Sequence, residues 1–354
     1  MHRLDSTPFR PLIAFAAALA LATIAGAQTY TARAGDNVGG NGDQSIGSYP
    51  VTAFWDGTWT QSVRHARSRA HRGALQCTTY CSVNGFYNME SYAIAEFRFD
   101  DLIFASPGTA PIQVGLNLSL EGDSSVVNGN GFSLTLRYAG TQVIGQATLG
   151  VNGVTTASGG LAGWSMTTLH SFVHTITVPV NTPVSLRINM TASASAVAGG
   201  HIANGHYTLR LGGATPIPSP GERYEVFDLP PGVSVDSVTA RISNNIWTTP
   251  ERLHLSTNHA VVAPGEGLRL EAWNGDVGAP VALSIGWDTT PASPGVRPMI
   301  WRAFTGTLNS AGSWEVDSIQ NAPALAGMTM LVRAYSIDLT GRPTRSRRLA
   351  IQFQ

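Results

Sequence analysis

The sequence predicts an all-β protein of two antiparallel β-sandwich domains behind a signal peptide. Many short segments alternate apolar and polar residues with a period of two, which buries one face of a strand and leaves the other in water. Glycine, at 38 residues, and other turn-forming residues separate these segments. Only 12% of the residues are charged, and the 3.6-residue period of an amphipathic helix is nearly absent after the N-terminal segment.

Residues 1–27 have the pattern of a secretory signal peptide. Arg3 and Arg10 precede an apolar run from Leu12 to Ile24, and a small-residue exit follows at residues 25–27. A basic start, an apolar segment of roughly 7–15 residues and such an exit define this signal. The run is shorter than the roughly 20 apolar residues of a membrane span. We therefore expect an exported chain that begins near Gln28, works in the periplasm, at the cell surface or outside the cell, and has no transmembrane segment or covalent anchor.

Residues 28–48 are expected to form a flexible leader. The segment Gly35–Asp43 is rich in glycine, asparagine and aspartate, which is the composition of loops and turns. A calcium-binding β-helix repeat is the alternative, but only one imperfect copy is present.

Residues 49–240 are predicted to form the larger sandwich, which we expect to be jelly-roll-like. Its alternating segments are typical of antiparallel strands with one buried face. The proline-rich segment Thr215–Gly221 is interpreted as a loop inside this domain, because proline denies donors to a sheet. The predicted strands are Tyr92–Phe99, Ile112–Leu120, Phe132–Tyr138, Thr141–Leu149, Phe172–Val178, Val184–Met190, Tyr207–Leu211 and Tyr224–Phe227.

Residues 241–354 are predicted to form a smaller, immunoglobulin-like sandwich. Seven candidate strands joined by glycine-containing turns match such a domain in number and spacing. These strands are Arg252–Leu255, Leu268–Trp273, Val281–Trp287, Ile300–Leu308, Ser313–Ile319, Met328–Ile337 and Arg348–Phe353.

Cys77 and Cys81 are the two cysteines of the chain. In an oxidising compartment, two cysteines this close together are expected to form a local disulfide that pins a loop. Metal ligation or a redox pair is the alternative, but a zinc site needs about four ligands.

The segment Val63–Arg72 carries four arginines and two histidines. We interpret it as a solvated face or loop that precedes the cysteine segment. Binding of an anionic polymer is the alternative, because basic clusters attract such ligands.

Tryptophans supply the candidate ligand-binding residues. Trp55 and Trp59 lie close together in the sequence, and an exposed tryptophan ring on a sandwich can stack on a sugar. The tryptophans of the smaller domain, Trp273, Trp287, Trp301 and Trp314, are expected to be buried.

Two further groups of polar residues carry no catalytic or metal prediction. The carboxylates Glu90, Glu96, Asp100 and Asp101 cluster in sequence, and Glu96 and Asp100 would lie roughly 13 Å apart on one face of a strand. We expect these four carboxylates to lie at the surface, with calcium binding as an unsupported alternative. His170, His174, His201 and His206 are expected to be rim or surface histidines, with a pooled metal site as the alternative.

The first domain resembles the exported β-sandwich proteins of environmental Gram-negative bacteria that often carry a Pro-Glu-Pro C-terminal sorting tail. The resemblance lies in its Gly/Ala/Ser/Thr-rich alternating strands and in the closing segment Phe227–Ser237. The second domain resembles C-terminal sandwich modules of planctomycete-type surface proteins, through Phe304–Trp314 and Leu325–Met330. The chain ends without the sorting tail, and neither family supplies a catalytic residue.

We therefore expect a non-catalytic protein of the cell surface or extracellular space. Carbohydrate binding or adhesion is the more specific version of this hypothesis. Its expected partners are extracellular glycans or surface polymers, and no cofactor is predicted. The 22 basic and 22 acidic residues cancel, which argues against a nucleic-acid partner. A secreted polysaccharide-degrading hydrolase with a jelly-roll domain is the alternative.

Overall fold

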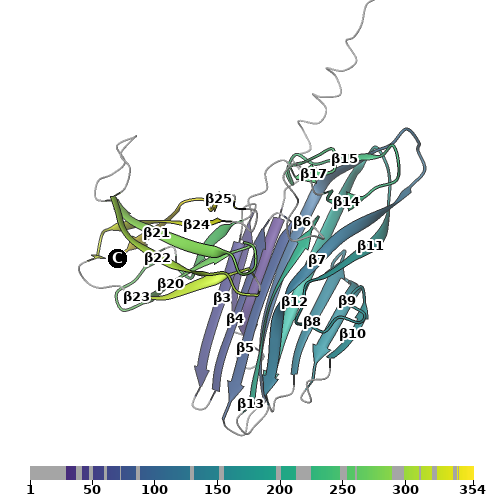
Figure 1. Ribbon diagram of the computed structural model, residues 1–354. Helices are drawn as coiled ribbons and strands as arrows, with labels where there is room; N and C mark the ends of the chain where they lie inside the picture. The colour runs from purple at the N-terminus through teal and green to yellow at the C-terminus, as the bar shows by residue number, and fades with distance from the viewer. Residues whose placement is uncertain are drawn as a thin grey trace, which may run out of the picture.

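The computed structural model is built of strands in two sandwiches, a large one and a small one beside it (Figure 1). This confirms the all-β prediction. The structure describes residues 29–36, 42–47, 51–59, 62–71, 73–84, 88–127, 131–150, 155–196, 201–212, 225–247, 253–259, 261–288, 299–310, 312–320, 325–337, 341 and 343–354. The predicted signal peptide lies outside these residues. Within them, no helix combines the length and the hydropathy that a membrane span requires.

Two antiparallel sheets form the large sandwich. Sheet 1 runs in the order β10 (Thr155–Gly159), β9 (Gln142–Leu149), β8 (Gly131–Tyr138), β12 (Pro183–Ala196), β6 (Met89–Ala105), β1 (Thr29–Asp36) and β2 (Gly42–Gly47), with β15 (Ser234–Asp236) also paired to β6. Sheet 2 runs in the order β11 (His170–Val178), β7 (Ile112–Val127), β13 (His201–Leu211), β5 (Ala74–Val83), β4 (Ser62–His71) and β3 (Val51–Trp59), with β14 (Phe227–Asp228) also paired to β7.

The core of the large sandwich lies between these sheets. Alternate residues of β6 and β7, such as Phe97 and Leu116, point inward and are fully buried. The phase of β6 changes at Asp100 and Asp101, where the pairing with β12 shifts between Val184 and Leu186. This β-bulge turns both Phe99 and Leu102 into the core although they are three residues apart.

The expected flexible leader is wrong for the parts that the structure describes. β1 and β2 pair with each other, and β1 also pairs with β6. Tyr30, Ala32 and Ala34 alternate into the core and are almost fully buried. Small alanines made the alternation inconspicuous in the sequence, and the pairing with β6 supplies the stabilisation that local composition does not.

The predicted Cys77–Cys81 disulfide is also wrong. Both thiols are free and buried, on the same face of β5. Four residues of extended strand separate them by roughly 13 Å, whereas a disulfide joins Cα atoms less than about 7 Å apart. The thiols instead contact the carbonyl oxygens of Met190 and Met89, at 3.5 and 3.4 Å.

The small sandwich has its own core. One sheet runs β18 (His254–Thr257), β20 (Gly267–Trp273) and β23 (Trp314–Gln320). The other runs β19 (Val261–Val262), β26 (Leu349–Phe353), β24 (Thr329–Ile337), β21 (Pro280–Asp288) and β22 (Met299–Thr307), with β25 (Pro343–Arg345) beside β24. Its core includes Leu270, Leu283, Val332 and Ile351, and it forms a cluster separate from the first core.

A short hairpin, β16 (Ile242–Ser243) and β17 (Ile246–Trp247), closes the first sandwich. Ile242 and Trp247 pack with the first core, and Leu253 is the first residue of the second core. The change from one core to the other therefore falls between Trp247 and Leu253.

Candidate functional site

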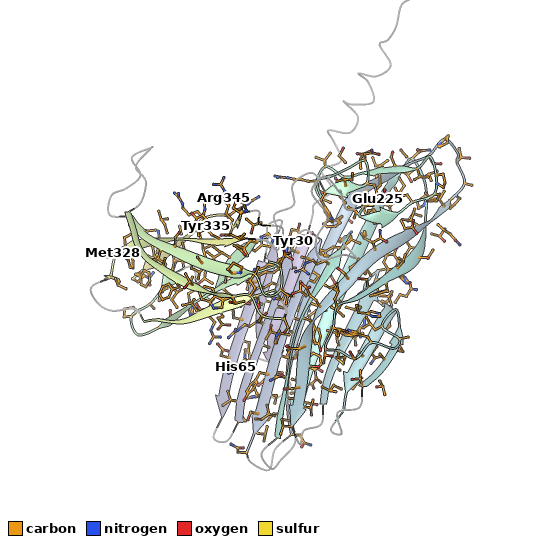
Figure 2. The ribbon with its side chains drawn as sticks, in the orientation of Figure 1. Tyr30, His65, Glu225, Met328, Tyr335 and Arg345 are labelled. Carbon is orange, nitrogen blue, oxygen red and sulfur yellow. The ribbon has the colours of Figure 1, made fainter. Side chains whose placement is uncertain are left out.

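The outer face of sheet 2 carries the small sandwich, which lies beside β3, β4 and β5 in Figure 1. Figure 2 labels His65 on these long strands. We call the polar contact between the two sandwiches the seam. From the large sandwich it comprises Asp56, His65, Arg67, Arg69, Gln76, Glu121, Asp123, His206 and Arg210, and from the small one Ser256, Arg269, Glu271, Asn274, Ser310 and Glu315.

The predicted basic segment supplies the centre of the seam, because it forms β4. Alternation on a strand sends odd and even positions to opposite faces. Arg67 and Arg69 therefore face the small sandwich, whereas Arg64 faces inward and pairs with Asp36, both almost fully buried. The interpretation of this segment as a solvated face or loop is wrong for Arg64, Arg67 and Arg69, because both faces of β4 are covered at these positions.

Arg69 is the most deeply buried charge of the seam, with no exposed surface. Its guanidinium pairs with Glu271, donates to Gln76 Oε1 at 2.7 Å and reaches Ser256 Oγ at 3.3 Å. Burial lowers the pKa of Arg69 to about 10, against the opposing effect of Glu271. The side chain therefore stays charged at neutral pH and holds strands of both sandwiches.

Arg67 and Arg269 extend this network. Arg67 pairs with Glu315, and Arg269 Nε lies 2.8 Å from the other oxygen of the same carboxylate. Arg269 also reaches Asp56 of β3 at 3.1 Å, and His65 lies 2.5 Å from that aspartate. Burial raises the pKa of Asp56, but the His65 hydrogen bond and the charges of Arg269, His65 and Arg67 outweigh it and hold the pKa below the ordinary 3.8.

The far end of the seam contains a serine, a histidine and an aspartate. His206 Nε2 lies 2.9 Å from Ser310 Oγ and 3.1 Å from Asp123 Oδ1, and Ser310 also donates to Asp123. A catalytic triad needs the serine and the carboxylate on opposite ring nitrogens. Here both contact Nε2, so these residues join the two sandwiches and do not form a proton relay.

Arg210 completes this end. It pairs with Glu121 on β7, donates to Asn274 Oδ1 at 2.9 Å and reaches the Gly275 carbonyl at 3.3 Å. One side chain thus connects sheet 2 to a turn of the small sandwich.

Aromatic rings lie among these charges. The guanidinium carbon of Arg69 lies 5.3 Å from the Phe54 ring centroid, a cation–π distance. Trp273 is 1% exposed and shares a strand face with Arg269 and Glu271. Its predicted burial is confirmed, on the face that carries the seam.

Trp55, a predicted ligand-binding residue, is a packing residue in this structure. Its ring packs against the first core and covers Gly57, and the Arg64 guanidinium lies 5.2 Å from the ring centroid. Trp59 lies at the end of β3, and its side chain is outside the described residues. The Trp55 ring is therefore engaged in contacts within the large sandwich.

The four carboxylates of residues 90–101 have separate partners. Glu96 pairs with Arg187 at 2.8 Å, and Asp100 pairs with Arg98 at 2.7 Å on the outer face of sheet 1. Asp101 accepts hydrogen bonds from Ser237 and Thr239 and so holds the turn after β15. Glu90 lies opposite Ser195 at the start of β6.

The histidines are also dispersed. His170 Nε2 lies 2.8 Å from the Gly160 carbonyl, and burial lowers the pKa of His174 on the same strand face. His206 belongs to the seam, and the side chain of His201 is outside the described residues. Among the residues that are described, no three His, Cys, Asp or Glu side chains form a group suited to a metal ion.

Sequence reasoning missed the acidic half of the seam. Glu271 and Glu315 lie in strands that were predicted, with the alternation that sends them to one face. Arg67 and Arg69 carry the same signal, two residues apart on one strand. The two ion pairs join Arg69 to Glu271, 202 positions away, and Arg67 to Glu315, which is farther still, and no local pattern encodes these contacts.

No protein-family model and no curated protein sequence matches this chain. Among solved structures, a polysaccharide lyase has a TM-score of 0.17 at 8% identity, over 93% of this chain and 39% of that one. A β-glucuronidase from Parabacteroides merdae has a TM-score of 0.20 at 8% identity, over 76% of this chain and 28% of that one. The adhesin domain of Epf from Streptococcus pyogenes has a TM-score of 0.19 at 7% identity, over 86% of this chain and 91% of that one. The chain thus spans well under half the length of the lyase and the glucuronidase, and scores this low support no argument about fold or function.

Proposed function

We propose that this is an exported, non-catalytic protein that presents a polar sandwich face to extracellular glycans or surface polymers. The observation that carries the proposal is the seam, which holds the small sandwich against sheet 2. Sheet 1 then provides the other broad face of the large sandwich. A protein that places one face toward a polymer benefits from a fixed angle between its domains.

The outer face of sheet 1 has polar chemistry suited to a glycan. Two of its arginines are paired with carboxylates, since Arg187 contacts Glu96 and Arg98 contacts Asp100, and Arg137 donates to Thr191 Oγ1 at 3.4 Å. Between and beside these pairs lie short hydroxyl and amide side chains in register across β12 and β8, at positions 189, 191, 193, 133 and 135. Ser133 and Ser193 share a 2.9 Å hydrogen bond. Hydroxyls can donate and accept, as sugar hydroxyls do.

A glycan-array screen of the chain from Gln28 onward, with release of soluble oligosaccharides measured in parallel, tests the proposal. We expect binding without release. Thr191→Arg places a long charged side chain in the middle of the face and should abolish binding. Gln113→Arg, at an exposed position of β7 on sheet 2, is the matched control and should leave binding intact.

Two outcomes would contradict the proposal. Release of oligosaccharides would favour a polysaccharide hydrolase. If a folded protein neither binds a glycan on the array nor releases oligosaccharides, the protein is a spacer without a glycan partner.

A further inference from the structure

Four polar residues form a row across sheet 2, beneath the small sandwich. Arg69 on β4 stands opposite Gln76 on β5, Gln76 opposite Thr208 on β13, and Thr208 opposite Glu121 on β7. Arg69, Gln76 and Thr208 have no exposed surface, and Glu121 is 8% exposed. Water is therefore excluded from a row that holds a hydroxyl, an amide, a carboxylate and a guanidinium.

The hydroxyl and the amide are in contact. Gln76 Nε2 lies 3.4 Å from Thr208 Oγ1, so the hydroxyl oxygen lies next to the amide whose carbon it would attack. The carbon that would be attacked, Cδ, is bonded to that nitrogen, and reacting groups held in contact gain the rate advantage of an intramolecular reaction.

The guanidinium activates the amide. Arg69 Nη1 donates to Gln76 Oε1 at 2.7 Å, which is the oxygen that becomes negative when a nucleophile adds to the amide carbon. A fixed positive charge in a water-excluded site stabilises such an oxyanion strongly. Ser256 and Glu271 of the small sandwich hold Arg69 in this position.

The carboxylate is placed to accept the hydroxyl proton. Glu121 is directly opposite Thr208 on the neighbouring strand, and side chains so paired have Cβ atoms about 4.5–5.5 Å apart. Arg210 pairs with the same carboxylate and so fixes its position beside Thr208.

We propose that Thr208 and Gln76 form an intramolecular ester cross-link. Thr208 Oγ1 adds to Gln76 Cδ while its proton passes to Glu121, and Arg69 stabilises the oxyanion on Oε1. The Cδ–Nε2 bond then breaks, the amide nitrogen takes the proton from Glu121, and ammonia leaves. One C–O bond replaces one C–N bond, and no oxidant, reductant or cofactor is consumed.

The small sandwich completes this site, and the bond would in turn fix the face on which it docks. Docking brings Ser256 and Glu271 to Arg69 and excludes the water that would hydrolyse the ester. The cross-link ties β5 to β13 through residues 132 positions apart, so it would restrict the unfolded chain over a long loop. It is independent of any glycan that the protein binds.

Peptide mapping of the exported chain tests the proposal. Trypsin cleaves after arginine, so Gln76 falls in the peptide 73–98 and Thr208 in the peptide 188–210. We expect the two peptides joined, with a combined mass one ammonia below their sum, and separated by hydroxylamine, which cleaves esters. The location must be shown at the peptide level, because an N-terminal Gln28 would also lose ammonia on cyclising. Recovery of both peptides separate and unmodified would overturn the proposal.

Variants distinguish the chemistry from a mere hydrogen bond. Thr208→Ser keeps the nucleophile and should still give the joined peptides, whereas Thr208→Val keeps the shape and should give none. Glu121→Gln should slow the joining, measured as the joined fraction against time after refolding. A joined species that persists in folded Thr208→Val would assign the bond to another residue and also overturn the proposal. If Thr208→Val fails to fold, the peptide map of the unaltered chain and the time course of Glu121→Gln still decide whether the ester forms.

Discussion

Arg69 illustrates what a buried charge requires at the scale of a single residue. A charged group without exposed surface carries a desolvation cost of several kcal/mol, which only close partners can offset. Arg69 has three such partners, Gln76, Ser256 and Glu271. Two of them belong to the small sandwich, so the charge is compensated only when the two sandwiches are in contact.

Glu271→Gln is therefore expected to destabilise the protein severely. The substitution keeps the shape but leaves Arg69 as a buried charge without its counter-charge, which typically costs about 3–5 kcal/mol. Urea unfolding measures the change. Arg98→Gln is the control, since the Arg98 side chain is 50% exposed and a surface ion pair is worth about 0–1 kcal/mol. Equal effects of the two variants would contradict a special role for the seam pair.

The two thiols give a second prediction at this scale. Burial raises the pKa of Cys77 strongly and that of Cys81 to about 11, and only a thiolate reacts with a disulfide reagent. We expect no reaction of the native protein with Ellman's reagent, and two thiols per chain in denaturant without any reductant. If the denatured, unreduced chain shows no reactive thiol, Cys77 and Cys81 form a disulfide and the prediction of free thiols is wrong.

At the scale of the element, strands with conspicuous apolar alternation could be predicted and strands without it could not. β6 and β7 were found because aromatic and aliphatic residues mark their inner faces. β1 carries alanines at two of its inner positions, and β4 carries arginines on both faces. Their burial depends on what covers them, and a propensity pattern does not contain that information.

Gly122 of β7 gives a prediction for this element. Its φ of +147° is a conformation that side chains rarely adopt, and an added Cβ would lie 2.1 Å from the His206 carbonyl oxygen. We expect Gly122→Ala to lower the free energy of unfolding by about 2 kcal/mol or more, from backbone strain and overpacking. Gly267→Ala is the control, because an added Cβ there meets nothing within 4 Å. Thermal unfolding of both variants makes the comparison, and a neutral Gly122→Ala would show that β7 can shift away from β13.

At the scale of the whole molecule, one carboxylate of the seam, Asp56, is expected to make stability depend on pH in the acid range. Asp56 joins β3 to Arg269 of the small sandwich, and its pKa is lowered in the folded protein. A lowered pKa means that the unfolded chain binds the proton first. The stabilisation is therefore complete above the ordinary value of 3.8 and is lost as the pH falls through the lower, folded pKa.

Asp56→Asn should make the free energy of unfolding depend less on pH below 3.8. Urea unfolding from neutral pH to below 3.8 measures it, with Asp100→Asn as a control, because Asp100 lies on the outer face of sheet 1, away from the seam. If the acid limb of Asp56→Asn coincides with that of the unaltered protein, other carboxylates carry the acid sensitivity.

The sequence by itself determined the all-β class, most strand positions of both sandwiches and the burial of Trp273, because these follow from period-two alternation within a few residues. Tertiary structure alone decided that β1 and β4 are sheet strands, that Cys77 and Cys81 lie too far apart to pair, and that Trp55 packs inward. It alone also brought Arg67 and Arg69 to Glu315 and Glu271. The physical reason is that the burial and the pairing of a charge or thiol depend on the residues that pack over it. These residues are distant in the chain, so no local pattern reveals them.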